Sequence, residues 1–198
     1  MQLKGLEKNK KQTLNVPDYL IYEMRRGVPI YYRDYDKVLR GEKTAEEVMG
    51  SGFLHAFVLT AILRFLIKEL EPKGFQILTG EVGFKFAPKS WYNLDIAIFE
   101  KGQLKEVKEG FLTTPPKIVI EIDTKADLRR FSSPSEYFHT KTQDLLDAGV
   151  EKVLWVFTKE KKVWLAEKGK RWIITDWNDE IELTDGVKLN LKKITEGV

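Results

Sequence analysis

The chain has 198 residues, a length that suggests a single domain. It contains no cysteine and only two histidines, which excludes disulfides, thiol catalysis and thiolate- or histidine-rich metal sites. Any bound metal must therefore be held mainly by carboxylates, which favours hard ions such as Mg²⁺ or Mn²⁺. The net charge of +3 permits binding to nucleic acid but does not by itself argue for it.

The beginning of the chain is polar and basic, with no apolar stretch of the kind found in a signal peptide. The longest apolar run, at residues 53–67, is interrupted by His55, Thr60 and Arg64. Such a run is not a transmembrane span. The sequence therefore predicts a soluble, cytoplasmic protein without a membrane partner.

The first elements of the chain are an arm, a hairpin and a long helix. Residues 1–18 are rich in lysine and are expected to form a loosely attached arm. Two short β-prone runs flank Gly27, which predicts a hairpin over residues 20–32. Apolar residues at helical spacing predict a helix over residues 52–70. Because apolar residues occupy most sides of this helix, we expect it to lie between the sheet and another layer or a partner subunit.

The rest of the chain alternates strands and helices. The elements predicted in chain order are strands at 75–79, 81–86, 93–99 and 117–123, a helix at 135–148 and a strand at 152–158. Short β-prone runs and turns at residues 162–191 predict a C-terminal antiparallel meander, and residues 167–198 are assigned as C-terminal strands. This order predicts one α/β domain over residues 1–198.

Acidic residues interrupt two of the predicted strands. Asp95 lies within the apolar strand 93–99, and a buried lone carboxylate needs a metal, a cationic side chain or backbone donors. Because side chains alternate along a strand, Glu121 and Asp123 should share one face of strand 117–123. If the two strands are neighbours, the three carboxylates converge and repel one another unless they are protonated or bound to a metal. A magnesium ion fits such a set.

Lys141 lies on the apolar face of the predicted helix 135–148. It follows Phe138 by three residues and precedes Leu145 by four, so the three side chains share one face. One interpretation is a lysine whose ammonium group extends to the edge of the helix. The other is a cation held near the carboxylates, where it binds phosphate or assists a metal-bound water.

These residues resemble a known nuclease core. An Asp in an apolar strand, a 25-residue gap and a Glu in the next strand are similar to the PD-(D/E)XK pattern. More closely, the chain resembles the Uma-two family of restriction-endonuclease-like proteins over about residues 20–166. The segments that carry the resemblance are YEMRRG (22–27), the helix with His55 near its start, LDIAIF (94–99), IVIEID (118–123) and KTQDLLDAGVEKVLWVF (141–157).

The resemblance implies a restriction-endonuclease-like core, with a mixed central sheet flanked by helices. It implies metal ligands at Asp95, Glu121 and the carbonyl of Ile122, an active-site lysine at Lys141, and an upstream acid at Glu23. The implied cofactor is Mg²⁺ or Mn²⁺, and the implied activity is endonucleolytic hydrolysis of phosphodiester bonds in DNA.

The chain departs from the pattern at two positions. Leu94 stands where the motif usually has proline, which affects only the start of the strand. Asp123 stands where the superfamily's lysine would lie, so the site lacks its cation if Lys141 does not replace it. The alternative function is therefore a catalytically inactive nuclease fold that acts as a nucleic-acid-binding or regulatory homo-oligomer, most simply a dimer.

Several further residues are candidates for secondary roles. Asp123 and Glu81 are possible accessory acids of the site. Lys125, Arg129 and Arg130 follow Glu121 closely and are candidates for contacts with backbone phosphates, although such a charge run is commonly a solvated loop. His55 is expected to be a helix-start residue with a satisfied ring rather than a catalytic group.

Overall fold

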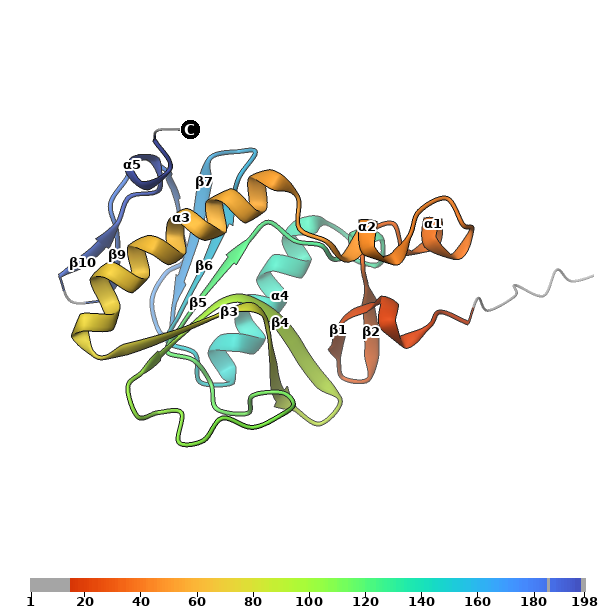
Figure 1. Ribbon diagram of the computed structural model, residues 1–198, viewed down its shortest axis with the longest axis horizontal. Coiled ribbons are helices and arrows are strands. Elements are labelled where there is room, and N and C mark those ends of the chain that lie inside the picture. The colour runs from red at the N-terminus through yellow and green to blue at the C-terminus, as the bar shows by residue number, and fades with distance from the viewer. Residues whose placement is uncertain (1–14, 185, 197–198) are drawn as a thin grey trace, which may run out of the picture.

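The computed structural model describes residues 15–184 and 186–196 (Figure 1). Most of the predicted arm, residues 1–14, lies outside the described residues. The strands of the main sheet are β1 (Ile21–Arg25), β2 (Val28–Tyr31), β3 (Phe75–Ala87), β4 (Ser90–Glu100), β5 (Ile118–Ile122), β6 (Lys152–Phe157), β7 (Lys162–Glu167) and β8 (Ile173–Asp176). The helices are α1 (Tyr35–Leu39), α2 (Ala45–Met49), α3 (Phe53–Leu70), α4 (Pro134–Asp147) and α5 (Leu191–Thr195).

The main sheet is mixed, as predicted. Its strand order is β2-β1-β4-β5-β6-β7-β8, and β3 also pairs with β4. Only β5 and β6 run parallel, and α4 provides the connection between them. The N-terminal hairpin and the α/β class are confirmed.

The two long helices cover opposite faces of this sheet (Figure 1). Successive residues of the central strands alternate between the two faces. Ile118 and Ile120 of β5 pack in one cluster with α3, whereas Val119 packs in the other cluster with α4. The site residues of β4 and β5 therefore lie within a covered sheet.

Two predicted details differ from the structure. The expected strands 75–79 and 81–86 form the single strand β3, which continues through a bulge at Gly80 and Glu81, both with positive φ (98° and 58°). The predicted C-terminal antiparallel strands are present but are divided between two sheets. β7 and β8 extend the main sheet, while β9 (Ile181–Thr184) and β10 (Val187–Leu189) form a separate pair followed by α5.

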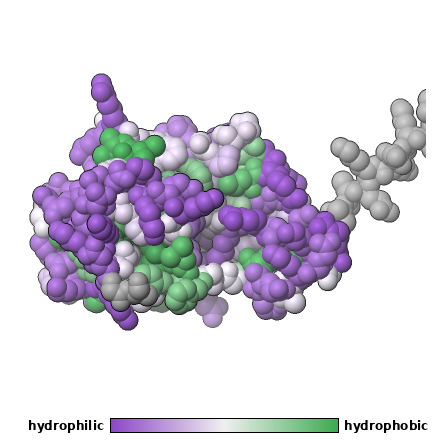
Figure 2. Space-filling model, turned by 90° about the horizontal axis from the view of Figure 1, so that it is seen from above, coloured by the Kyte–Doolittle hydropathy of each residue, from purple (hydrophilic) through white to green (hydrophobic). Residues whose placement is uncertain are grey.

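The long helix α3 is only partly covered. Its buried side contacts the sheet and α5, but Phe53, Leu54 and Ile67 remain exposed. Figure 2 shows that the face seen from above is mainly hydrophilic, with separate hydrophobic patches. Among the described residues, no helix is both long enough and apolar enough to cross a bilayer.

The edge of β4 that faces β5 has two partner strands. β3 pairs with β4 along its whole length, so β1 and β5 must share the other edge. There, β1 pairs at Trp91 and β5 pairs from Ile96 to Ile98. The backbone of residues 92–95 therefore faces the point where β1 and β5 separate, and the candidate site is located at this point.

Candidate active site

Three acidic side chains and one lysine meet where β1 and β5 separate. Glu23 comes from β1, Asp95 from β4, Glu121 from β5 and Lys141 from α4. In the antiparallel β4–β5 register, Ile96 lies opposite Ile120, which brings the residues on their outer sides, Asp95 and Glu121, into facing positions. The predicted convergence of the two strand acids and the helical ammonium group is present in the structure.

Lys141 does not extend to the surface, because its side chain is only 1% exposed. Its Nζ donates to Glu23 Oε1 at 2.6 Å and to the Asn93 carbonyl at 2.8 Å. It also lies 3.0 Å from Glu121 Oε1. Burial lowers the pKa of Lys141, but Glu121 and Glu23 outweigh it and the pKa ends above its ordinary value. The lysine is therefore charged at neutral pH.

Glu121 is the least satisfied of the three acids. Its Oε1 is close enough to Lys141 for an ion pair, yet the angles are not those of a hydrogen bond. Among the described residues, it is the one buried side-chain oxygen or nitrogen without a hydrogen-bond partner. Burial raises the pKa of Glu121 to about 8, because it outweighs the lowering effect of Lys141, and the charges of Asp95 and Glu23 add to the rise. This carboxyl group thus has an unused acceptor and a strong affinity for a proton or another cation.

In contrast to those of Glu121, both oxygens of Glu23 accept hydrogen bonds. Its second oxygen, Oε2, accepts a hydrogen bond from the Tyr137 hydroxyl at 2.8 Å. Burial raises the pKa of Glu23, although Lys141 and Tyr137 partly oppose this rise. Tyr137 did not enter the predicted site, although its position four residues before Lys141 places it on the same helix face. That spacing was the signal available in the sequence.

Asp95 connects the buried cluster to α3. Its Oδ2 accepts from the backbone N–H of Ile122 at 2.8 Å, and its Oδ1 lies 3.5 Å from His55 Nε2. The hydrogen bond to Asp95 raises the pKa of His55. The ring of His55 is thus satisfied, as expected, but its partner is one of the predicted metal ligands. Nothing in the local sequence of α3 reveals this pairing.

The two predicted accessory acids have other partners. Asp123 follows the last residue of β5 with a positive φ of 51°, so it does not continue the alternation that would place it beside Glu121. Its carboxylate accepts from the N–H and the hydroxyl of Thr158, at 3.0 and 2.6 Å. Glu81 pairs with Lys125 and accepts from the Tyr32 hydroxyl at 3.5 Å. Their accessory role stays a prediction.

The three predicted phosphate contacts do not lie together. Lys125 Nζ also donates to the Met49 carbonyl at 2.9 Å, and this residue lines a cleft described below. Arg129 forms ion pairs with Asp127 and Asp36 on another part of the surface. Arg130 lies over the ring of Tyr31, 5.3 Å from its centroid. Only Lys125 is near the candidate site.

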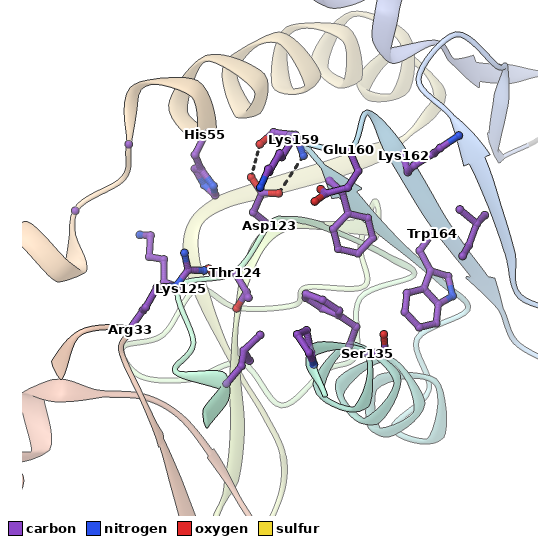
Figure 3. A pocket seen from close by; sticks show the side chains of 18 residues that line it. Arg33, His55, Asp123, Thr124, Lys125, Ser135, Lys159, Glu160, Lys162 and Trp164 are labelled. Carbon is purple, nitrogen blue, oxygen red and sulfur yellow. Dashed lines mark hydrogen bonds between the residues drawn. The ribbon is translucent and has the colours of Figure 1, made fainter. Parts of the chain in front are cut away.

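An open cleft of about 740 Å³ adjoins the cluster (Figure 3). His55 and Asp123 line it, whereas Asp95, Glu121 and Lys141 are buried and do not. His55 is thus the side chain that contacts both Asp95 and the cleft.

The buried donor set fits a hard divalent ion. Glu23 and Glu121 face Lys141, and Glu121 keeps an unused oxygen while the charge of Asp95 acts on it. In the part of the chain that the structure describes, no three His, Asp or Glu side chains are arranged to hold a metal. An ion on Asp95 and Glu121 would therefore complete its coordination with carbonyl oxygens, such as that of Ile122, and with water, as Mg²⁺ commonly does.

The fold is restriction-endonuclease-like, and the cluster of acids with Lys141 lies within it. No protein-family model and no curated protein matches the chain. Among solved structures, it is similar to a protein from Anabaena variabilis ATCC 29413 described as a "putative nuclease belonging to DUF820", which is the Uma-two family. The TM-score is 0.58 at 13% identity, and the match covers 73% of this chain and 82% of the other. This likeness establishes the fold, and the predicted fold class is confirmed.

Proposed function

We propose that the chain is a divalent-metal-dependent nuclease that hydrolyses phosphodiester bonds, with DNA as its substrate. The observation that carries the proposal is the meeting of Asp95, Glu121 and Lys141 in one buried cluster, with an unsatisfied oxygen on Glu121. The restriction-endonuclease-like fold supports it, because that fold is shared with a solved structure described as a "putative nuclease".

The side chains of the cluster have distinct roles in this proposal. Lys141 orients Glu121 and stabilises its ionised form, and Glu23 in turn fixes the lysine. The Ile122 N–H orients Asp95 on one side, and His55 contacts it on the other. A bound Mg²⁺ or Mn²⁺ supplies charge neutralisation at the phosphate and a more acidic water. His55, which lines the cleft, is placed to hold a proton close to the reacting groups.

A nicking assay tests this function. Supercoiled plasmid is incubated with the protein and Mg²⁺, Mn²⁺ or EDTA, and relaxed product is measured. We expect metal-dependent nicking that is lost in Glu121→Ala and in Asp95→Asn. Glu180→Gln, at an exposed position, is the matched control and should retain activity. Equal nicking by Glu121→Ala would show that a contaminant is responsible.

A second function is supported by one specific observation. Lys141 is fully engaged by its partners, and both oxygens of Asp95 already have contacts. These bonds are consistent with an inactive nuclease fold that binds nucleic acid or regulates other proteins, as a homo-oligomer. Titration of Mn²⁺ by calorimetry separates the two functions. Binding that is lost in Glu121→Ala supports the nuclease, and its absence in the wild type favours the inactive fold.

A further inference from the structure

The cleft beside His55 has two chemically different sides (Figure 3). Arg33 and Lys125 lie on one side, and Trp164 lies on the other. His55 projects into the cleft from α3, and Ser135 reaches it from α4. The cleft is therefore built from both layers that enclose the candidate active site.

Aromatic side chains form part of the cleft lining. Phe138, Phe157 and Trp164 all contribute, and none of them is completely buried. The rings of Phe138 and Phe157 lie edge to face, with centroids 5.1 Å apart. The apolar surface continues to Ile174, which is 69% exposed. Partly exposed rings beside a proposed hydrolytic site are typical of a platform on which planar groups stack.

Basic residues accompany these rings. Arg33, Lys125, Lys159 and Lys162 line the cleft, against the acids Asp123 and Glu160. Asp123 is further occupied by two hydrogen bonds from Thr158. Lys125 is paired with Glu81, and Lys162 is paired with Asp176. Lys159 is exposed, and among the described residues it forms no ion pair. The cleft thus combines excess positive charge with stacking surface, which suits a polyanion that has accessible aromatic faces.

We propose that this cleft binds single-stranded nucleic acid, with bases stacked on Trp164 and Phe157 and phosphates near Lys159. The inference rests on the proposed nuclease function and specifies its substrate as unpaired strands. In a duplex the base faces are covered by their neighbours, so an aromatic lining gains little from it. DNA and RNA single strands share the chemistry that the cleft recognises, and experiment distinguishes them.

Binding can be measured separately from cleavage by working in EDTA. Fluorescein-labelled oligo(dT), oligo(rU) and a DNA duplex, each of about 20 units, are titrated with the full chain and followed by anisotropy. We expect the preferred single strand to bind at least ~10-fold more tightly than the duplex. Tighter binding of oligo(dT) or of oligo(rU) identifies the sugar. Equal or tighter binding of the duplex, or no binding of any probe, overturns the proposal.

Matched variants locate the binding surface. Trp164→Ala should weaken single-strand binding about 10-fold, since one stacked base is lost. Phe111→Ala removes an aromatic ring that is 49% exposed and lies outside the cleft, and it should have no effect. If Trp164→Ala fails to fold, exposed Lys159→Ala serves instead. It should lower the slope of log Kd against log salt by about 1, whereas Lys170→Ala should not change it. Equal effects in variant and control contradict the assignment.

The binding measurements test the single-strand inference, and the plasmid assay tests the nuclease function, so each proposal can be contradicted without the other. A protein that nicks plasmid with metal but prefers duplex in EDTA keeps the nuclease function and overturns the single-strand inference. A protein that binds single strands through Trp164 but never cleaves DNA supports the binding cleft and contradicts the nuclease function.

Discussion

The buried cluster and the open cleft are neighbours, but their charged side chains differ in exposure to solvent. In the cluster, Glu23, Glu121 and Lys141 are almost completely excluded from solvent and neutralise one another at short distances. In the cleft, Lys159 is exposed to water. His55 lies between the two regions, with one contact to Asp95 and one surface on the cleft.

This difference separates positioning from binding. Buried charges interact strongly, and the cost of removing one partner is high, because the other charge is left without water or a counter-ion. Exposed charges are screened by salt, so each contributes little to stability but can attract a polyanion. The comparison predicts that substitutions in the cluster affect folding and metal binding, and that those in the cleft affect mainly ligand binding.

The largest expected effect comes from Lys141→Met. The substitution leaves Glu23 and Glu121 buried without their common cation, which should lower the free energy of unfolding by ~3–5 kcal/mol. Urea denaturation at pH 7 measures it. The loss should become smaller as the pH falls, because burial raises the pKa of both carboxyl groups and protonation removes the charge that lacks a partner. Lys170→Met, whose side chain is 70% exposed, is the matched control and should change little. Equal stability of the two variants would contradict the idea that loss of a buried charge costs more than loss of an exposed one.

A pH dependence should follow from Glu121. Its pKa in the folded chain is about 8, raised mainly by burial from an ordinary value of 4.5. The folded state therefore binds this proton more tightly than the unfolded state. Its contribution to stability is complete below pH 4.5 and is lost as the pH rises through about 8. Metal affinity should change in the opposite direction, because the ion competes with the proton.

Glu121→Gln tests both parts of this prediction. In metal-free buffer, the variant should lose the decline in stability between pH 5 and pH 8.5 that denaturation of the wild type shows. It should also bind Mn²⁺ far more weakly in calorimetry. If the stability of the variant declines with pH as that of the wild type does, another group titrates in this range.

A smaller effect is expected from His55→Gln. The substitution removes a group that orients Asp95 but leaves the carboxylates and Lys141 in place. Plasmid nicking should fall about 10-fold, in the range found for residues that orient a metal ligand. The pH–rate profile should also lose a titration above 6.5, since Asp95 raises the pKa of His55 above that ordinary value. A lower rate with an unchanged pH profile would indicate a purely structural role.

Much of the fold could be predicted from periodicity. The helix 52–70 and the strand 152–158 are long regular patterns, and α3 and β6 follow them within one residue. The bulge that joins 75–79 and 81–86 into one strand could not, because Gly80 and Glu81 resemble a turn locally and only pairing with β4 keeps the strand continuous. Similarly, local alternation cannot show which of the late strands join the main sheet.

The candidate site was predictable where it depends on alternation within one element. Asp95 and Lys141 stand out because each interrupts an apolar face, and the structure brings them to one cluster. His55 could not be linked to Asp95, because α3 covers the other face of the sheet and only the chain's three-dimensional path joins them. Alternation places Asp123 beside Glu121 only if the strand continues through residue 123, whereas β5 ends at Ile122 and Asp123 has a positive φ.

The smallest expected effect separates a structural acid from a metal ligand. Asp123→Ala removes two accepted hydrogen bonds from Thr158, at 3.0 and 2.6 Å, and places alanine at a φ of 51°. The free energy of unfolding should fall by ~1–2 kcal/mol. Mn²⁺ affinity and nicking should stay within about threefold of the wild type, because the carboxylate binds Thr158 rather than facing Glu121. Asp123→Asn, which tolerates the left-handed backbone and keeps one acceptor, should recover most of the stability. A loss of metal binding as large as that of Glu121→Gln would show that Asp123 is an accessory metal ligand. Asp123 would then belong to the metal-binding cluster as well as to the cleft that it lines.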